Sequence, residues 1–114
     1  MDSQALSQLV VTALDDNKAR NIVCLDVRGL SNVADFMVVA TGTSSRHTKA
    51  LADKVADAVR ENGHRVFGME GEQVGEWVLL DVGDVLVHVM LEDTRKLYQL
   101  EKLWDIKSLG TAKA

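Results

Sequence analysis

The sequence predicts a mixed α/β domain in which a five-stranded sheet is flanked by helices. Short β-branched apolar runs alternate with longer segments of helical apolar spacing, in the order α-β-β-α-β-β-β-α. The 114 residues are 46% hydrophobic, which is enough for one packed core, and 26% charged, which is typical of a globular protein. We therefore expect one domain over residues 1–106, followed by a flexible tail over residues 107–114.

Periodicity and turn residues predict the elements of the first half. Apolar residues recur at helical spacing after Ser3, which is expected to be an N-cap, and again after Thr43 and Ser44. Gly63 follows the second helical pattern, where a glycine with positive φ commonly ends a helix. The continuously apolar strands suggest helices on both faces of the sheet, and the succession strand-helix-strand predicts a parallel, right-handed βαβ unit. The elements expected are helices over residues 3–19 and 44–62 and strands over residues 22–27, 36–40 and 64–68.

The stretch from Gly75 to Trp104 organises the second half of the chain. Two apolar runs flank Gly83-Asp84, and this pair predicts a hairpin because glycine takes positive φ without a steric penalty. An amphipathic helix is expected to follow. Period-two alternation in the hairpin and helical spacing after it separate a core set from an outward set. The core set is Val78, Leu80, Val82, Val87, Val89, Leu97 and Leu100, with Trp104 on the same helical stripe.

The outward set combines aromatic and charged residues. The stretch contains both tryptophans, the single tyrosine and several acids. Exposed Trp, Tyr and Arg are the residue types enriched in binding hot spots. A competing interpretation packs Trp77 under a loop and makes Tyr98 an ordinary half-buried side chain. The outward set is Trp77, Asp81, Asp84, Glu92, Arg95 and Tyr98.

The turn from Gly42 to His47 is the most enzyme-like motif. Hydroxyls and N–H groups at a helix N-terminus can hold a phosphate, so Thr43, Ser44, Ser45 and Arg46 are candidate anion-binding residues. Helix capping is the simpler interpretation, because no Walker-type Gly-Lys-Ser/Thr follows. The strand-turn-helix also resembles the nucleotidyltransferase fold, whose enzymes hold metal with two carboxylates spaced i, i+2. The strand expected after this helix has no acid, which indicates such a scaffold without the catalytic carboxylates.

Composition and charge argue against several other classes of function. The net charge of −4 disfavours binding to free nucleic acid. No apolar run is long enough to span a membrane and no secretion signal is evident, so we expect a cytoplasmic location. Cys24, the single cysteine, is expected to be a small buried hydrophobe. The three histidines fit no zinc pattern, and His88 is expected to be a hydrogen-bonded core or edge residue. We expect no metal and no cofactor.

Four separated segments carry a resemblance to a known family. They are Asp35–His47, Gly68–Gly71, Gly75–Met90 (beginning Gly-Glu-Trp-Val-Leu-Leu-Asp-Val-Gly-Asp) and Arg95–Trp104. Together, and in this order, they closely resemble the Iojap family, the ribosomal silencing factors. The resemblance extends from about residue 3 to Trp104, which is nearly the whole chain.

The resemblance implies a regulatory function without catalysis. Members of the family bind the large ribosomal subunit through its fourteenth protein, block joining of the small subunit sterically, and so repress translation, notably when nutrients run short. Their fold resembles that of nucleotidyltransferases, and some of them form homodimers. For this chain the resemblance implies that the outward set contacts the ribosomal protein, and the acids of that set suit a basic surface. The alternative is a phosphate- or nucleotide-handling enzyme of nucleotidyltransferase-like fold.

Overall fold

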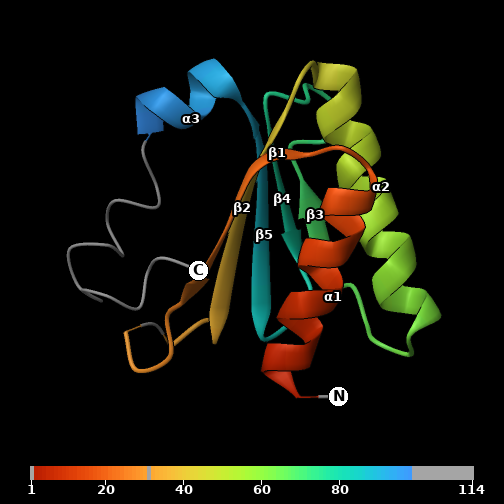
Figure 1. Cartoon of the computed structure of the whole chain (residues 1–114), viewed down its shortest axis with the longest axis vertical. Coiled ribbons are helices and arrows are strands. Elements are labelled where there is room, and N and C mark those ends of the chain that lie inside the picture. Colours follow the sequence, from red (N-terminus) through yellow and green to blue (C-terminus); the bar gives the residue numbers. More distant parts are fainter. Residues whose placement is uncertain (1, 31, 99–114) are drawn as a thin grey trace.

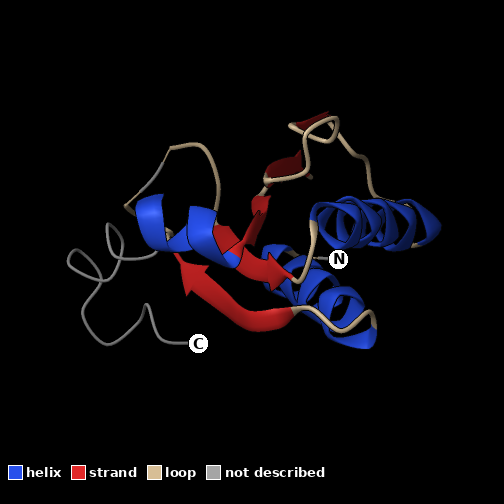
Figure 2. Cartoon of the chain, turned by 90° about the horizontal axis from the view of Figure 1, so that it is seen from above, coloured by secondary structure: helices blue, strands red, loops and turns tan. Residues whose placement is uncertain are grey.

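The computed structural model describes residues 2–30 and 32–98, and these form a mixed five-stranded sheet with three helices (Figure 1). Helices α1 and α2 cover one face of the sheet, and the short helix α3 lies on the other side, at one end of the strands (Figure 2). The elements are α1 (Ser3–Asp16), β1 (Arg20–Asp26), β2 (Phe36–Gly42), α2 (Ser45–Glu61), β3 (Gly68–Glu70), β4 (Trp77–Asp81), β5 (Val85–Leu91) and α3 (Glu92–Tyr98). The predicted fold class and the predicted order of elements are confirmed.

The strands are arranged in the order β1-β2-β5-β4-β3. The central strands β2 and β5 are parallel, with Phe36 opposite Val85 and Gly42 opposite Leu91. The β1–β2, β4–β5 and β3–β4 pairs are antiparallel. Strand β3 therefore runs in the same direction as β2, as a βαβ unit requires, but it lies at the far edge of the sheet and not beside β2. The partner that runs parallel to β2 comes from the hairpin strand β5.

The third strand differs from the prediction. A strand was expected over residues 64–68, but β3 comprises Gly68, Met69 and Glu70, which pair with Asp81, Leu80 and Leu79. Before it, a single backbone bond joins the Phe67 N–H to the Asp81 carbonyl at 2.8 Å. The β-branched and aromatic pair Val66-Phe67 suggested an earlier strand, but only residues 68–70 find a full ladder of partners on β4.

The main core lies between the sheet and the helices α1 and α2. The helices contribute Val10 and Leu14, and Leu51, Val55 and Val59, all of which are at most 1% exposed. The sheet contributes the inward-facing residues of its central strands. Each fully buried Val or Leu stabilises the fold by about 1.5–3 kcal/mol relative to an exposed side chain. The hairpin residues predicted for the core are confirmed: Val78, Leu80, Val82, Val87 and Val89 are all buried.

The opposite face of the sheet carries a second, smaller apolar cluster. It consists of Leu25, Val27, Met37, Val39 and Met90, with Val23 and Trp77 packed against it. Helices were expected over both faces of the sheet, but only one face is covered by long helices. Helix α3, on the other face, has no buried residue among those the structure describes.

The prediction that Leu97 belongs to the core is wrong. Helix α3 begins directly after β5, at the end of the sheet, and Leu97 is 75% exposed there. Leu100 and Trp104, the predicted boundary after residue 106 and the predicted tail lie outside the described residues. None of the helices in the described part of the chain is long and apolar enough to cross a membrane.

Two tight turns around β4 depend on glycine. Gly83, with φ of +93°, occupies the first central position of the predicted two-residue turn, which the Val82 N–H closes onto the Val85 carbonyl at 3.1 Å. Gly71, with φ of +85°, lies so close to β4 that a Cβ atom there would be 2.1 Å from the Trp77 carbonyl oxygen. The loop before β4 is thereby packed against the strand that carries Trp77.

The helix ends follow the capping rules, with one correction. The N-cap of α1 is Asp2 and not Ser3, because the Asp2 carboxylate accepts the Ala5 N–H at 2.8 Å. This helix ends at Asp16, earlier than expected, since Lys18 adopts a left-handed backbone with φ of 68°. The N-cap of α2 is Ser44, and Gly63 has positive φ after its last turn, both as predicted.

Candidate functional site

Three aromatic side chains meet near the carboxyl end of β5. Trp77 lies opposite Met90 in the β4–β5 ladder, which makes it a diagonal neighbour of His88 on the same face. The indole Nε1–H of Trp77 donates to His88 Nδ1 at 3.0 Å, and the two ring centroids are 5.9 Å apart. The ring of Tyr98 in α3 lies 4.7 Å from the Trp77 ring, inclined by 50°. We call Trp77, His88 and Tyr98 the aromatic cluster.

The members of the aromatic cluster differ in exposure. Tyr98 is 53% exposed, while Trp77 and His88 are partly buried. Burial lowers the pKa of His88 from 6.5 to about 4, so its imidazole is neutral near pH 7. Because Nδ1 accepts the indole N–H, the ring proton of the neutral imidazole is on Nε2. The prediction of a hydrogen-bonded histidine in or beside the core is confirmed.

Arg95 connects α3, which follows β5, to strands β2 and β1. Its Nη1 donates to the Thr41 hydroxyl at 2.9 Å and to the Asn21 carbonyl at 2.6 Å. These bonds tie the helix that carries Tyr98 to the ends of β2 and β1. They lie beside an open polar pocket of about 350 Å³, lined by Arg20, Asn21, Thr41, Gly42, Thr43, Leu91, Glu92 and Asp93.

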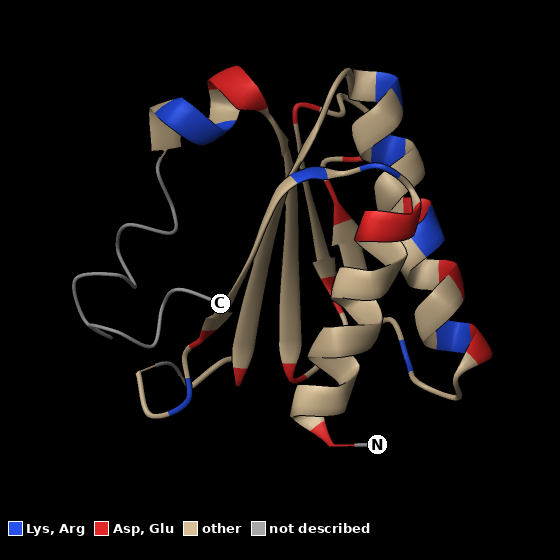
Figure 3. Cartoon of the chain, viewed as in Figure 1, with Lys and Arg blue, Asp and Glu red and all other residues tan. Residues whose placement is uncertain are grey.

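The structure divides the outward set between the two ends of β5. Trp77, Glu92, Arg95 and Tyr98 lie near its carboxyl end, while Asp81 and Asp84 lie at the hairpin turn. Asp81 is four residues, or about 13 Å, along β4 from Trp77. Acidic residues accordingly appear at both ends of β5 (Figure 3). One oxygen of the Asp81 carboxylate accepts the Gly83 N–H at 2.9 Å, so this acid also stabilises the turn.

The turn before α2 uses several of its polar groups internally. The Thr43 N–H donates to His47 Nδ1 at 2.9 Å, and the His47 N–H donates to the Ser44 hydroxyl at 3.1 Å. His47 Nε2 lies 3.0 Å from the Asn17 carbonyl at the end of α1, so the imidazole joins the two helices. The side chains of Thr43, Ser44, Ser45 and Arg46 are exposed. This geometry favours the capping interpretation over anion binding.

His47 is a residue whose role the sequence did not reveal. It was noted as part of the glycine-hydroxyl motif, but its function depends on the carbonyl of Asn17, 30 positions earlier in the chain. No local pattern marks such a contact, because it exists only once α1 and α2 pack side by side.

One prediction about metal-binding carboxylates is wrong. The strand after α2 was expected to have no acid, but β3 contains Glu70, since the strand begins later than predicted. Glu72, two residues further on, lies in the turn after the strand and not on it. Among residues 2–30 and 32–98 there is no group of three His, Cys, Asp or Glu side chains that could hold a metal ion.

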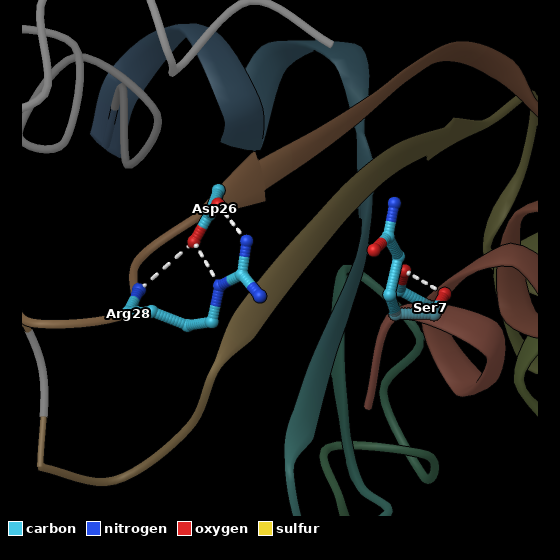
Figure 4. A network of polar contacts seen from close by, with 4 residues as sticks. Ser7, Asp26 and Arg28 are labelled. Atoms are coloured by element: carbon cyan, nitrogen blue, oxygen red, sulfur yellow. Dashed lines mark hydrogen bonds and ion pairs between the residues drawn. The ribbon is translucent and has the colours of Figure 1, made fainter. Parts of the chain in front are cut away.

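Figure 4 shows two further polar features, the Asp26–Arg28 pair at the end of β1 and Ser7 on α1, whose hydroxyl donates to the Gln4 carbonyl at 2.7 Å. Asp26 and Arg28 form an ion pair of 2.6 Å, and the hydrogen bond from Arg28 lowers the pKa of the Asp26 carboxyl. Arg28 is exposed and Asp26 is partly exposed, so solvent screening leaves this pair little effect on stability. Burial raises the pKa of the Cys24 thiol, which packs against the core beside Ser7. Cys24 packs against the core as a small hydrophobe, but it is partly buried and not fully buried as predicted.

Comparison with known proteins identifies the class to which this fold and surface belong. A crystal structure of a protein from Chromobacterium violaceum superposes with a TM-score of 0.90 at 46% identity, covering 91% of this chain and 87% of the other. A ribosomal silencing factor, RsfS, from Haemophilus influenzae is 43% identical over 88% of this chain and 98% of its own length. The chain is thus an α/β protein of the class of the ribosomal silencing factors.

The family follows from a match over almost the whole sequence. The family model described as "Ribosomal silencing factor during starvation" matches residues 1–113. The chain belongs to the RsfS family, which confirms the resemblance seen in the sequence. A more distant mouse relative, named "Mitochondrial assembly of ribosomal large subunit protein 1", is 31% identical over 88% of this chain and 45% of its own length.

Proposed function

We propose that the chain binds the large ribosomal subunit through its fourteenth protein and sterically blocks joining of the small subunit, repressing translation, for example on nutrient limitation. Membership of the RsfS family is the observation that carries this proposal. The names of the Haemophilus and mouse relatives, one a ribosomal silencing factor and the other a protein of large-subunit assembly, support it. In this proposal the chain acts in the cytoplasm by binding, without catalysis and without a cofactor.

The proposed docking surface has the Trp77–Tyr98 pair as its anchor at one end. Tyr98 is half exposed and packs on the Trp77 ring, so the two present a pre-ordered aromatic surface. Large, stiff aromatic side chains supply contact area at low entropic cost, and they dominate binding hot spots. Glu92 and Arg95 lie at the same end of β5 and complete this part of the surface.

The acids of the hairpin turn extend the docking surface along the sheet. Asp81 is on the same face of β4 as Trp77, four residues along the strand, and Asp84 follows in the turn. A standard interface covers about 800 Å² per partner, or roughly 28 Å across, so one partner can reach both ends of β5. Acids spread over this length suit a basic ribosomal protein, because complementary charge speeds encounter and fixes orientation.

Sedimentation tests the proposed function directly. The purified chain should co-sediment with large subunits, and an excess of it should lower the yield of joined ribosomes in a gradient. Tyr98→Ala should weaken binding by about 1–2 kcal/mol or more, as expected for a hot spot. Val74→Ala is a matched control, since Val74 is 65% exposed in the loop before β4, outside the proposed surface. Unimpaired joining of subunits in the presence of excess chain would contradict the proposal.

Self-association is a second part of the proposal. We infer a homodimer, as the resemblance implies for some members of the family. If the dimer covers Tyr98, it has to dissociate or rearrange before the chain can dock. Light scattering over a dilution series measures the dimer, and a mass of one chain at all concentrations would exclude it.

The turn over residues 43–46 is proposed to cap α2 and not to handle nucleotides. Its hydrogen bonds to His47 support this role. Titration with ATP and Mg²⁺ tests the alternative enzyme function. Submillimolar binding that is abolished by Ser44→Ala would favour the alternative.

A further inference from the structure

His88 is the interior member of the aromatic cluster. Its backbone lies between Val39 of β2 and Leu79 of β4, in the middle of the sheet. On the same face, Val39 and Met90 are fully buried. A polar ring in such a place needs a hydrogen-bond partner within the protein, because leaving a buried acceptor unpaired is costly. The partner of its Nδ1 is the indole of Trp77.

This bond fixes the orientation of a side chain on the proposed docking surface. The indole has a single N–H donor, and His88 Nδ1 accepts it at 3.0 Å. With that donor engaged, rotation of the Trp77 ring about its side-chain bonds would break the bond. The Tyr98 ring packs on the indole at 4.7 Å, so the orientation of the indole also determines what Tyr98 packs against.

We propose that His88 is a positioning residue for ribosome docking: it holds the indole of Trp77, and through it the ring of Tyr98, in the orientation that meets the ribosomal protein. The proposal rests on the proposed function, since it assigns a role within the same surface. His88 itself acts from beneath that surface. A positioning bond of this kind increases affinity by ordering the aromatic surface before the partner arrives, so that less freedom is lost on binding.

Two substitutions at position 88 separate positioning from packing. His88→Asn retains an acceptor, because its side-chain oxygen occupies about the place of Nδ1, whereas His88→Leu has a similar shape and no acceptor. Trp77→Phe retains an aromatic ring and removes the donor. The two substitutions at position 88 are made in the parent chain and in the Trp77→Phe chain, which gives a double-mutant cycle.

Two measurements are made on each variant. The first is the affinity for isolated large ribosomal subunits, measured by co-sedimentation. The second is the indole ¹⁵N–¹H resonance of Trp77, which is assigned by its loss in Trp77→Phe, together with its rate of hydrogen exchange. The resonance reports the bond itself, and the thermal midpoint of each variant shows that it is folded.

The expected pattern is specific to positioning. His88→Leu should lower the affinity about tenfold and accelerate exchange of the indole proton, and His88→Asn should restore most of both. In the Trp77→Phe chain, the Leu and Asn variants should bind alike. If His88→Leu fails to fold, His88→Phe takes its place, because it keeps a ring but has no nitrogen acceptor for the indole N–H, and the same losses are expected.

Other outcomes would overturn the proposal in distinguishable ways. If the parent chain does not bind large subunits, the proposed function fails, and the role of His88 fails with it. If the parent binds and His88→Leu binds equally well despite faster exchange of the indole proton, the function stands and positioning by His88 is refuted. An undiminished effect of His88→Leu in the Trp77→Phe chain would likewise show that His88 does not act through Trp77.

Discussion

Acidification should destabilise the fold through His88. Burial lowers the pKa of His88 from 6.5 to about 4 in the folded protein, so the unfolded chain takes up a proton first as pH falls. The stabilisation is therefore complete above the unfolded pKa of 6.5 and is lost as the pH falls towards 4. From these two pKa values, the loss is about 1 kcal/mol at pH 6, about 2 kcal/mol at pH 5 and about 3 kcal/mol at pH 4.

Urea unfolding at a series of pH values measures this loss. The free energy of unfolding is determined for the parent chain and for His88→Asn, which has no titratable group at this position. Every other ionisable group contributes equally to both chains, so the difference between the two curves isolates His88. The stability of the parent relative to the variant should fall by about 3 kcal/mol between pH 7.5 and pH 4. Parallel curves would refute a depressed pKa, and with it the burial that causes the shift.

Three further substitutions test the structural contacts. Gly71→Ala should destabilise the fold in urea by about 1–3 kcal/mol more than Gly29→Ala. Both positions have positive φ, but a Cβ at position 71 meets a β4 carbonyl at 2.1 Å, while one at position 29 has no neighbour within 4 Å; equal losses would contradict the clash. Thr41→Val should lower the free energy of unfolding by about 1.5 kcal/mol, because it removes the hydroxyl that accepts a hydrogen bond from Arg95. An equal loss in Thr41→Ser, which keeps the hydroxyl, would show that this bond is not responsible. Ser44→Ala should lower the free energy of unfolding by about 1 kcal/mol as an N-cap is lost, while Ser45→Ala should be nearly neutral; similar values for both would contradict the capping role.

Local patterns were sufficient for most of the secondary structure. The N-cap Ser44, the Gly83 turn and the buried face of the hairpin were predicted correctly, because each depends on residues close together in the sequence. The errors arose where a local pattern lacks its tertiary partner. Val66 and Phe67 have strand propensity, but residues 64–67 do not form a strand. Leu97 has helical core spacing but lies at the end of the sheet, where it is 75% exposed.

The candidate site was predicted in composition but not in arrangement. The sequence identified the aromatic and acidic residues of the last hairpin and helix, and its motifs predicted the family, which the family match confirms. It did not reveal that Trp77 bonds to His88, or that Arg95 reaches Asn21, 74 residues earlier in the chain. The sequence also did not reveal that Asp81 and Asp84 lie at the opposite end of β5 from the aromatic cluster.

The sequence by itself therefore determined the class of fold, the family and the residue types of the surface, since periodicity and motifs depend only on residues close together in the chain. The tertiary structure alone determined that β5 inserts beside β2, and that β3 lies at the edge. Strand order depends on which apolar faces pack together over long separations, and no local pattern encodes that choice. The same packing brings Trp77, His88 and Tyr98 together, so the surface proposed to meet the ribosome exists only in the folded chain.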